Sequence, residues 1–168
     1  MTYGKEIPMS DHYPAEIRIG GPLPRAILPK LIRTTVGEGV SAEGYGGPDA
    51  DSEDLRKAFQ EGKIVSLYSD QARYGMFAQL EEFLVKHRIH FDRCSEAFCQ
   101  YNAEIVSCRG GEEAIALPAD QSGHVMLRWE EVVGILDDNP LNDRAKLDAI
   151  RRLVAQPGTE PLSPIRFI

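Results

Sequence analysis

Residues 63–91, KIVSLYSDQARYGMFAQLEEFLVKHRIHF, contain the clearest secondary-structure signals of the chain. Residues 63–69 form the most strand-like stretch and have apolar side chains on both faces, which predicts a strand near the centre of a sheet. Residues 76–84 place apolar side chains at helical spacing, and residues 89–97 then alternate as another strand. This part of the sequence therefore predicts a strand–helix–strand unit.

The same succession of elements occurs earlier in the chain. A strand is predicted at residues 15–20, a helix over residues 27–36, and a second strand at residues 40–44. Two such units in one sheet predict an α+β fold with the ferredoxin-like split βαβ topology. The alternative is an α/β fold with a three-layer parallel sheet, because helices alternate with strands through the first half of the chain.

Further elements are predicted around these two units. An extra connecting helix begins at Asp51 or Ser52 and ends near Gly62. Strands at residues 103–109 and 113–117 flank Gly110-Gly111, a dipeptide typical of a tight hairpin turn. In the ferredoxin-like arrangement this hairpin would extend the sheet beyond the strand that begins at residue 89.

Two C-terminal helices follow the hairpin. The first places Trp129, Val132, Val133 and Leu136 on one face, and the second is capped by Asn142. We expect an irregular N-terminal arm at residues 1–14, a single α+β domain at residues 15–156, and a tail with prolines at residues 157–168.

The composition is that of a globular protein, with 42% hydrophobic and 27% charged residues. No apolar run is long enough to span a membrane, and residues 1–10 lack the apolar stretch of a secretion signal. The chain has three cysteines, an odd number that suits a reducing compartment better than a disulfide framework. We therefore expect a cytoplasmic protein that does not contact a membrane.

The net charge of −7 comes from one segment of the chain. Between residues 112 and 143 there are eight acidic residues and a single base, Arg128, so the rest of the chain is neutral. Such a segment repels nucleic-acid phosphates and attracts a protein partner with a basic surface, if its side chains share a face. The simpler alternative is the solvated side of helices. The predicted acidic surface consists of Glu112, Glu113, Asp120, Glu130, Glu131, Asp137 and Asp138.

Four polar residues alternate along the strand predicted from residue 89, namely His90, Asp92, Cys94 and Glu96. Alternation places them on one face, where they could bind a metal or, with the histidine beside the cysteine, produce a reactive thiolate. Residues two apart in a strand are about 6–7 Å apart, so only two of them could usually reach one metal. The alternative is an edge strand with a polar, half-solvated outer face.

No catalytic signature is found in the sequence, which has neither a Gly-x-Ser-x-Gly elbow nor a phosphate-binding P-loop. We therefore expect a non-enzymatic protein-interaction module without a cofactor, such as an inhibitor, adaptor or regulatory subunit. Its acidic surface would bind a basic partner, including a partner's nucleic-acid-binding groove, without binding nucleic acid itself. The apolar end of the tail, Phe167 and Ile168, could add to a sheet edge or fill a groove.

Two other functions remain open. The first is a small enzyme or ligand-binding protein that uses the face with His90 and Cys94, or the polar loop Ser69–Arg73 at the end of the predicted central strand. The second is a structural protein that oligomerises through an exposed strand edge.

Overall fold

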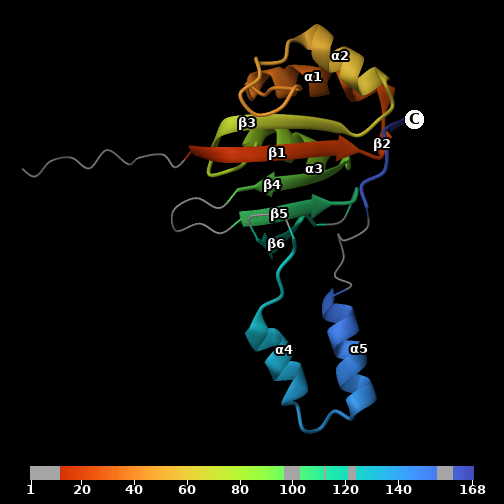
Figure 1. The fold of residues 1–168 in the computed structure, drawn as a ribbon. Coiled ribbons are helices and arrows are strands. Elements are labelled where there is room, and N and C mark those ends of the chain that lie inside the picture. Colours follow the sequence, from red (N-terminus) through yellow and green to blue (C-terminus); the bar gives the residue numbers. More distant parts are fainter. Residues whose placement is uncertain (1–11, 97–102, 112, 121–123, 155–160) are drawn as a thin grey trace, which may run out of the picture.

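The computed structural model describes residues 12–96, 103–111, 113–120, 124–154 and 161–168 (Figure 1). These residues form a mixed α+β fold with a five-stranded antiparallel sheet and five α-helices. The strands are β1 (His12–Gly20), β2 (Pro22–Leu23), β3 (Val65–Arg73), β4 (His90–Ser95), β5 (Ala103–Cys108), β6 (Ile115–Ala119) and β7 (Arg166–Phe167). The helices are α1 (Leu28–Gly37), α2 (Ser52–Gln60), α3 (Ala78–Lys86), α4 (Trp129–Leu136) and α5 (Asp143–Val154), with a 3-10 turn η1 (Arg25–Ile27) before α1.

The strand order in the large sheet is β3-β1-β4-β5-β6. Strands β3 and β4 both run antiparallel to β1 and lie on either side of it, and α3 connects them. The predicted strand–helix–strand unit is therefore confirmed. The predicted hairpin is also confirmed, because β5 pairs with β4 and extends the sheet on that side.

Strand β1, and not β3, occupies the middle of this unit, which corrects the prediction that residues 63–69 form a central strand. Apolar side chains on both faces of a strand indicate that both faces are covered, but not that strands pair on both edges. In β3 the second face is covered in part by a loop residue, because the ring of Tyr45 packs edge-on against Tyr68 with 5.1 Å between centroids.

The strand predicted at residues 40–44 is reduced to one bridge, in which Ser41 pairs antiparallel with Tyr68 of β3. The chain turns away directly afterwards, because the Ser41 hydroxyl accepts a hydrogen bond from the Glu43 amide and Gly44 has a φ of +124°. After this turn the chain comes back, and the amide of Ala50 donates a hydrogen bond to the carbonyl of Val40. These local hydrogen bonds replace the ladder that a longer strand would need.

The predicted helix cap at Asp51 is confirmed. Its carboxylate accepts hydrogen bonds from the amides of Glu53 and Asp54 at 2.7 and 2.9 Å, and the Asp54 carboxylate accepts one from the Asp51 amide. This reciprocal capping box begins α2.

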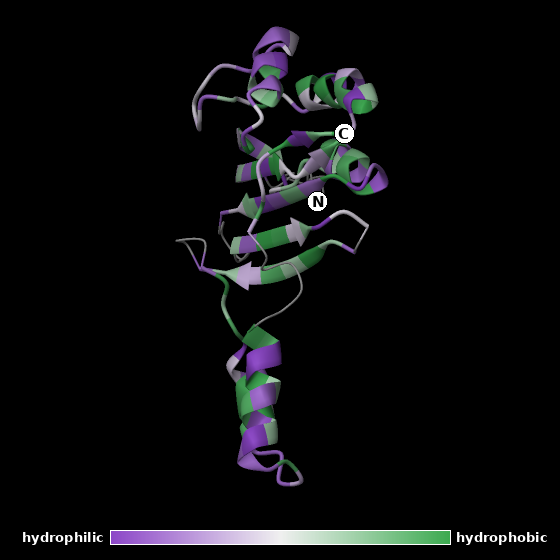
Figure 2. Cartoon of the chain, turned by 90° about the vertical axis from the view of Figure 1, so that its right-hand side faces the viewer, coloured by the Kyte–Doolittle hydropathy of each residue, from purple (hydrophilic) through white to green (hydrophobic). Residues whose placement is uncertain are grey.

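Apolar side chains from one face of the large sheet form the core together with those of α1, α2 and α3. Helix α3 lies behind the sheet in the view of Figure 1, and Figure 2 shows the molecule from the side. Ile17 and Ile19 of β1, Leu67 of β3 and Phe91 of β4 are fully buried in this core. β1 begins at His12, within the segment predicted as an irregular arm, and residues 1–11 of that arm lie outside the described residues.

The C-terminal residues return to the beginning of the sheet. β7 pairs in parallel with β2, and the amide of Arg166 donates to the carbonyl of Gly21 at 2.9 Å. Leu162 and Ile165 are buried against the body of the protein. In contrast, α4 and α5 form a helical hairpin that extends away from the sheet beyond β6 (Figure 1).

Among the described residues, no helix has the length and apolar character that crossing a membrane requires.

Candidate interaction surface

The helices of the α4–α5 hairpin are more exposed than the other helices of the described structure. No described residue of α4 or α5 is buried, whereas each of α1, α2 and α3 buries at least two apolar side chains. The two helices contact each other, and the ammonium group of Lys146 donates to the carbonyl of Leu136 at the tip of the hairpin. The Asn142 side chain caps α5 as predicted, accepting from the Ala145 amide at 2.9 Å.

Large apolar side chains are exposed along this hairpin and the segment that leads to it. The indole of Trp129, at the start of α4, is 70% exposed. The others are Val125, Met126, Leu127, Leu136, Leu147 and Val154. Single exposed apolar residues are ordinary, whereas several on one element are typical of an interaction site. Figure 2 shows the apolar residues interleaved with polar ones along the hairpin.

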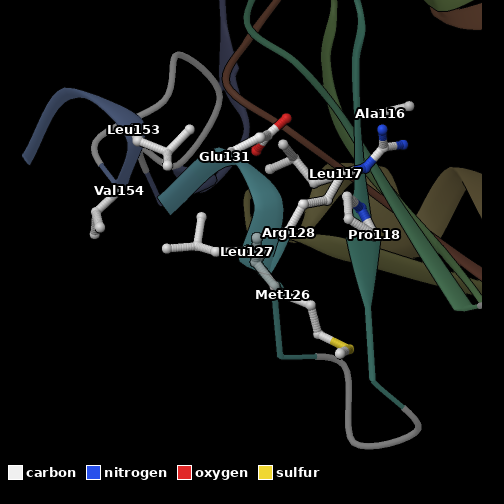
Figure 3. A pocket seen from close by; sticks show the side chains of 10 residues that line it. Ala116, Leu117, Pro118, Met126, Leu127, Arg128, Glu131, Leu153 and Val154 are labelled. Carbon is white, nitrogen blue, oxygen red and sulfur yellow. The ribbon is translucent and has the colours of Figure 1, made fainter. Parts of the chain in front are cut away.

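A groove of about 280 Å³ lies where the hairpin joins the sheet (Figure 3). Pro118 of β6 and the side chains of Met126 and Leu127 line one side, and Leu153 and Val154 of α5 line the other. A second groove of about 540 Å³ shares Leu117, Pro118 and Arg128 with the first and reaches Tyr74 and Met76. The two grooves therefore adjoin each other at the junction between the hairpin and the sheet.

The predicted acidic residues lie in three separate places. Glu113 precedes β6, and Asp120 directly follows it, so β6 separates the two. Asp120 accepts a hydrogen bond from the His124 amide at 2.9 Å, which makes it part of a turn. Glu112 lies outside the described residues.

The other four predicted acids belong to the hairpin itself. Glu130 and Glu131 lie in the first turn of α4, where the helix dipole favours carboxylates, and Asp137 and Asp138 follow its end. None of these four makes an ion pair with a described residue. The structure thus combines unpaired acids and exposed apolar side chains on one element.

His90, Asp92 and Cys94 alternate on the face of the sheet opposite the core, as predicted, and Glu96 directly follows the end of β4. The geometry around them is that of a structural network. Asp92 forms an ion pair with Arg109 at 2.7 Å and accepts a hydrogen bond from the hydroxyl of Ser107. The His90 ring fits closely against Gly21 and Gly110, where a Cβ would come within 2.7 Å of it.

The protonation states of this face do not favour thiol chemistry. Burial raises the pKa of the Cys94 thiol, and the nearby Glu16 and Glu96 raise it further. Burial lowers the pKa of His90, and the positive charge of Arg109 acts in the same direction. A thiol that stays neutral is a weak nucleophile. In the described part of the chain, no group of three or more metal-ligating side chains is close enough to hold a metal ion.

The polar loop Ser69–Arg73 is part of strand β3 and lines a groove of about 460 Å³ with Glu38, Met76 and Phe77. Asp70 accepts a hydrogen bond from the amide of Gly46 at 2.7 Å. This carboxylate is therefore already used to hold a loop against the sheet edge.

The tail residues Phe167 and Ile168 lie against their own chain. The Phe167 ring packs on the core, with the Arg25 guanidinium 4.8 Å from its centroid. Ile168 donates its amide to the carbonyl of Leu23 at 3.1 Å, although the residue as a whole is exposed. One edge of the tail is thus paired with β2 within the chain.

The exposed apolar residues of α4 and α5 were missed as a surface at the level of sequence, where helical periodicity indicates only that one face is apolar. The length of the two helices could have indicated that they need a partner. α4 has 8 residues and α5 has 12, which is too short for stable isolated helices in water.

The chain matches no protein-family model, no curated protein and no solved structure.

Proposed function

We propose that this protein is a non-enzymatic protein-interaction module, and that the α4–α5 hairpin is its contact element. The observation that carries this proposal is the absence of any buried side chain among the described residues of α4 and α5. Covering apolar surface stabilises a complex by about 25 cal/mol per Å² before the costs of association. Because the side chains of the hairpin bury so little surface within the chain, a partner would supply most of the contacts that cover them.

The charge of the hairpin supports a partner that combines apolar and basic side chains. Glu130, Glu131, Asp137 and Asp138 lie beside the apolar residues and are not neutralised by any described residue. Charge complementarity of this kind increases the association rate and selects among partners. A partner's nucleic-acid-binding groove is one such basic surface, and it stays a prediction from the charge alone. The cytoplasmic location likewise stays a prediction from the cysteine content.

The enzyme alternative has less support. The Cys94 thiol has a raised pKa, and Asp92 is held by Arg109 and Ser107. A catalytic pair needs a nucleophile within hydrogen-bond distance of a base. The network around Asp92 instead joins β4 to β5.

We also propose that the fold is a ferredoxin-like arrangement whose second strand is shortened to the bridge at Ser41. That bridge lies antiparallel on β3, and β1 and β4 follow in order across the sheet. The β5–β6 hairpin then extends the arrangement on the β4 side.

The experiment that tests the interaction proposal compares partner capture by three forms of the tagged full chain. The wild type is compared with the double variant Trp129→Ser, Leu147→Ser and with the control Val85→Ser. Val85 lies on α3 and is 44% exposed, close to the 49% of Leu147, so the control shows the effect of losing one exposed apolar side chain at another place. We expect the double variant to bind the captured protein at least about tenfold more weakly, and the control to bind it like the wild type.

Equal capture of the partner by all three forms would contradict the proposal. A control variant that binds the partner as weakly as the double variant would also contradict it. Circular dichroism of each form checks that the fold is kept, which we expect because the replaced side chains are exposed.

A further inference from the structure

Both helices of the hairpin carry an apolar seam with the spacing i, i+3, i+7. On α4 the seam is Trp129, Val132 and Leu136, and on α5 it is Leu147, Ile150 and Val154. This spacing is typical of helices that pack in bundles. The first and last residue of each seam are exposed, so the contact between α4 and α5 covers the seams only in part.

Each helix also has a pair of like charges seven residues apart, and the two pairs have opposite signs. Glu130 and Asp137 are seven residues apart at α4, and Arg144 and Arg151 are seven residues apart on α5. Residues seven apart on a helix point within about 20° of the same direction. Each pair therefore forms a row along one side of its helix, one negative and one positive. Glu130 lies about 100° around α4 from Trp129, on the side of the helix that also carries Val133.

These rows do not pair with each other within the chain. Glu130, Asp137 and Arg144 make no ion pair with a described residue, and Arg151 contacts Asp148 of its own helix at 3.4 Å. As whole helices the two also differ in sign. α4 has two acids and no base, and α5 has four bases and two acids, a net charge of −2 against +2.

We propose that a second copy of this chain covers the hairpin, so that two hairpins form an antiparallel four-helix bundle with twofold symmetry. This inference rests on the proposed function and names the partner of that same surface. Each α4 then lies between its own α5 and the α5 of the second copy. In antiparallel register the start of α4 meets the end of the other α5, which places Glu130 beside Arg151 and Asp137 beside Arg144.

A second copy explains both features of the surface at once. The seams that are half covered in one hairpin meet in the middle of the bundle, where all four helices contribute apolar side chains. The acidic row of α4 meets the basic row of α5 twice, because a twofold interface repeats every contact. The basic and apolar partner required by the proposed function is therefore α5 of another copy.

A charge-exchange experiment tests this arrangement. The variant Glu130→Arg, Asp137→Arg makes both rows positive, and the variant Arg144→Glu, Arg151→Glu makes both rows negative. We expect the wild type to have twice the 18.7 kDa mass of the chain by light scattering. Each variant alone should dissociate with a Kd raised at least about tenfold, because like charges then face each other.

An equimolar mixture of the two variants should recover the dimer, because each positive row then meets a negative row. A wild type that stays monomeric at high protein concentration would overturn the inference, as would a dimer that neither variant weakens. A third outcome separates the two proposals. If the wild type is monomeric but captures a different protein, and the Trp129→Ser, Leu147→Ser variant no longer binds that protein, the proposed function is retained and only the second copy is rejected.

Discussion

At the scale of single residues, Arg93 holds strand β4 to α3. Its guanidinium is buried between two carboxylates, with Nη2 2.6 Å from Glu104 and Nε 3.1 Å from Glu81. Nη1 also donates to the carbonyl of Gly75 at 2.8 Å. The charge is thus matched on three sides by strand β5, helix α3 and the turn before it.

We expect Arg93→Ala to lower the free energy of unfolding by about 3 kcal/mol, because it leaves the half-buried carboxylate of Glu81 without its cation. Urea denaturation followed by circular dichroism measures the change. Lys57→Ala is the control, since Lys57 pairs with Glu53 on the surface of α2 and its loss should cost less than about 1 kcal/mol. Equal effects of the two substitutions would show that Arg93 contributes no more than a surface ion pair.

At the scale of elements, Gly20 allows the C-terminal segment to dock. A Cβ at Gly20 would lie 2.2 Å from the backbone oxygen of Ser163 and 3.0 Å from the Leu162 side chain. The residue therefore sits at the closest approach between β1 and the returning tail. Ser163 also accepts the Gly21 amide at 2.8 Å, so displacing it breaks a hydrogen bond as well.

We expect Gly20→Ala to destabilise the protein by about 2 kcal/mol and to increase the rate at which carboxypeptidase removes the tail. Gly134→Ala is the matched control, because a Cβ at Gly134 in α4 meets nothing within 4 Å. That substitution should instead stabilise α4 by about 0.5–1 kcal/mol. A Gly20→Ala protein with a wild-type tail digestion rate would mean that the tail is not held there.

The sequence was sufficient to predict the elements whose signals are local. The β3–α3–β4 unit follows from apolar periodicity, and the β5–β6 hairpin follows from Gly110-Gly111. The strand at residues 40–44 could not be excluded in this way, because the hydroxyl of Ser41 and the glycines after it compete with the ladder. The order of strands in the sheet depends on contacts between distant residues, which periodicity does not contain.

At the scale of the whole molecule, the sequence predicted which kinds of residue the candidate site contains, but not how they are arranged. The acidic segment was visible in the sequence, but β6 separates Glu113 from Asp120, and both lie away from the far end of α4. The pattern of Trp129, Val132 and Leu136 predicted an apolar helix face correctly. Whether that face is covered depends on where the helix lies relative to the sheet, and a single helix does not encode its neighbours.

Association should also change the dynamics of the hairpin. In dilute protein, where the dimer dissociates, we expect the amides of α4 and α5 to exchange hydrogen much faster than those of β1, because neither helix has a buried side chain among its described residues. At concentrations well above the dimer Kd the same amides should become protected. Hydrogen exchange measured by mass spectrometry at both concentrations tests this.

The β1 peptides are the internal control and should exchange equally at both concentrations, since β1 is paired on both sides within the chain. A hairpin as protected in the dilute protein as β1 would show that the two helices are stable without a partner.

The path of the chain has an evolutionary consequence. The chain leaves the sheet after β6, builds the hairpin, and returns to pair with β2 at the opposite end of the sequence. Both attachment points belong to the folded body, so the hairpin is an insertion whose length and residues can change while the body keeps its packing. We expect homologues that diverged from this chain to differ most between β6 and β7, and to acquire new binding specificities there through substitutions neutral for folding.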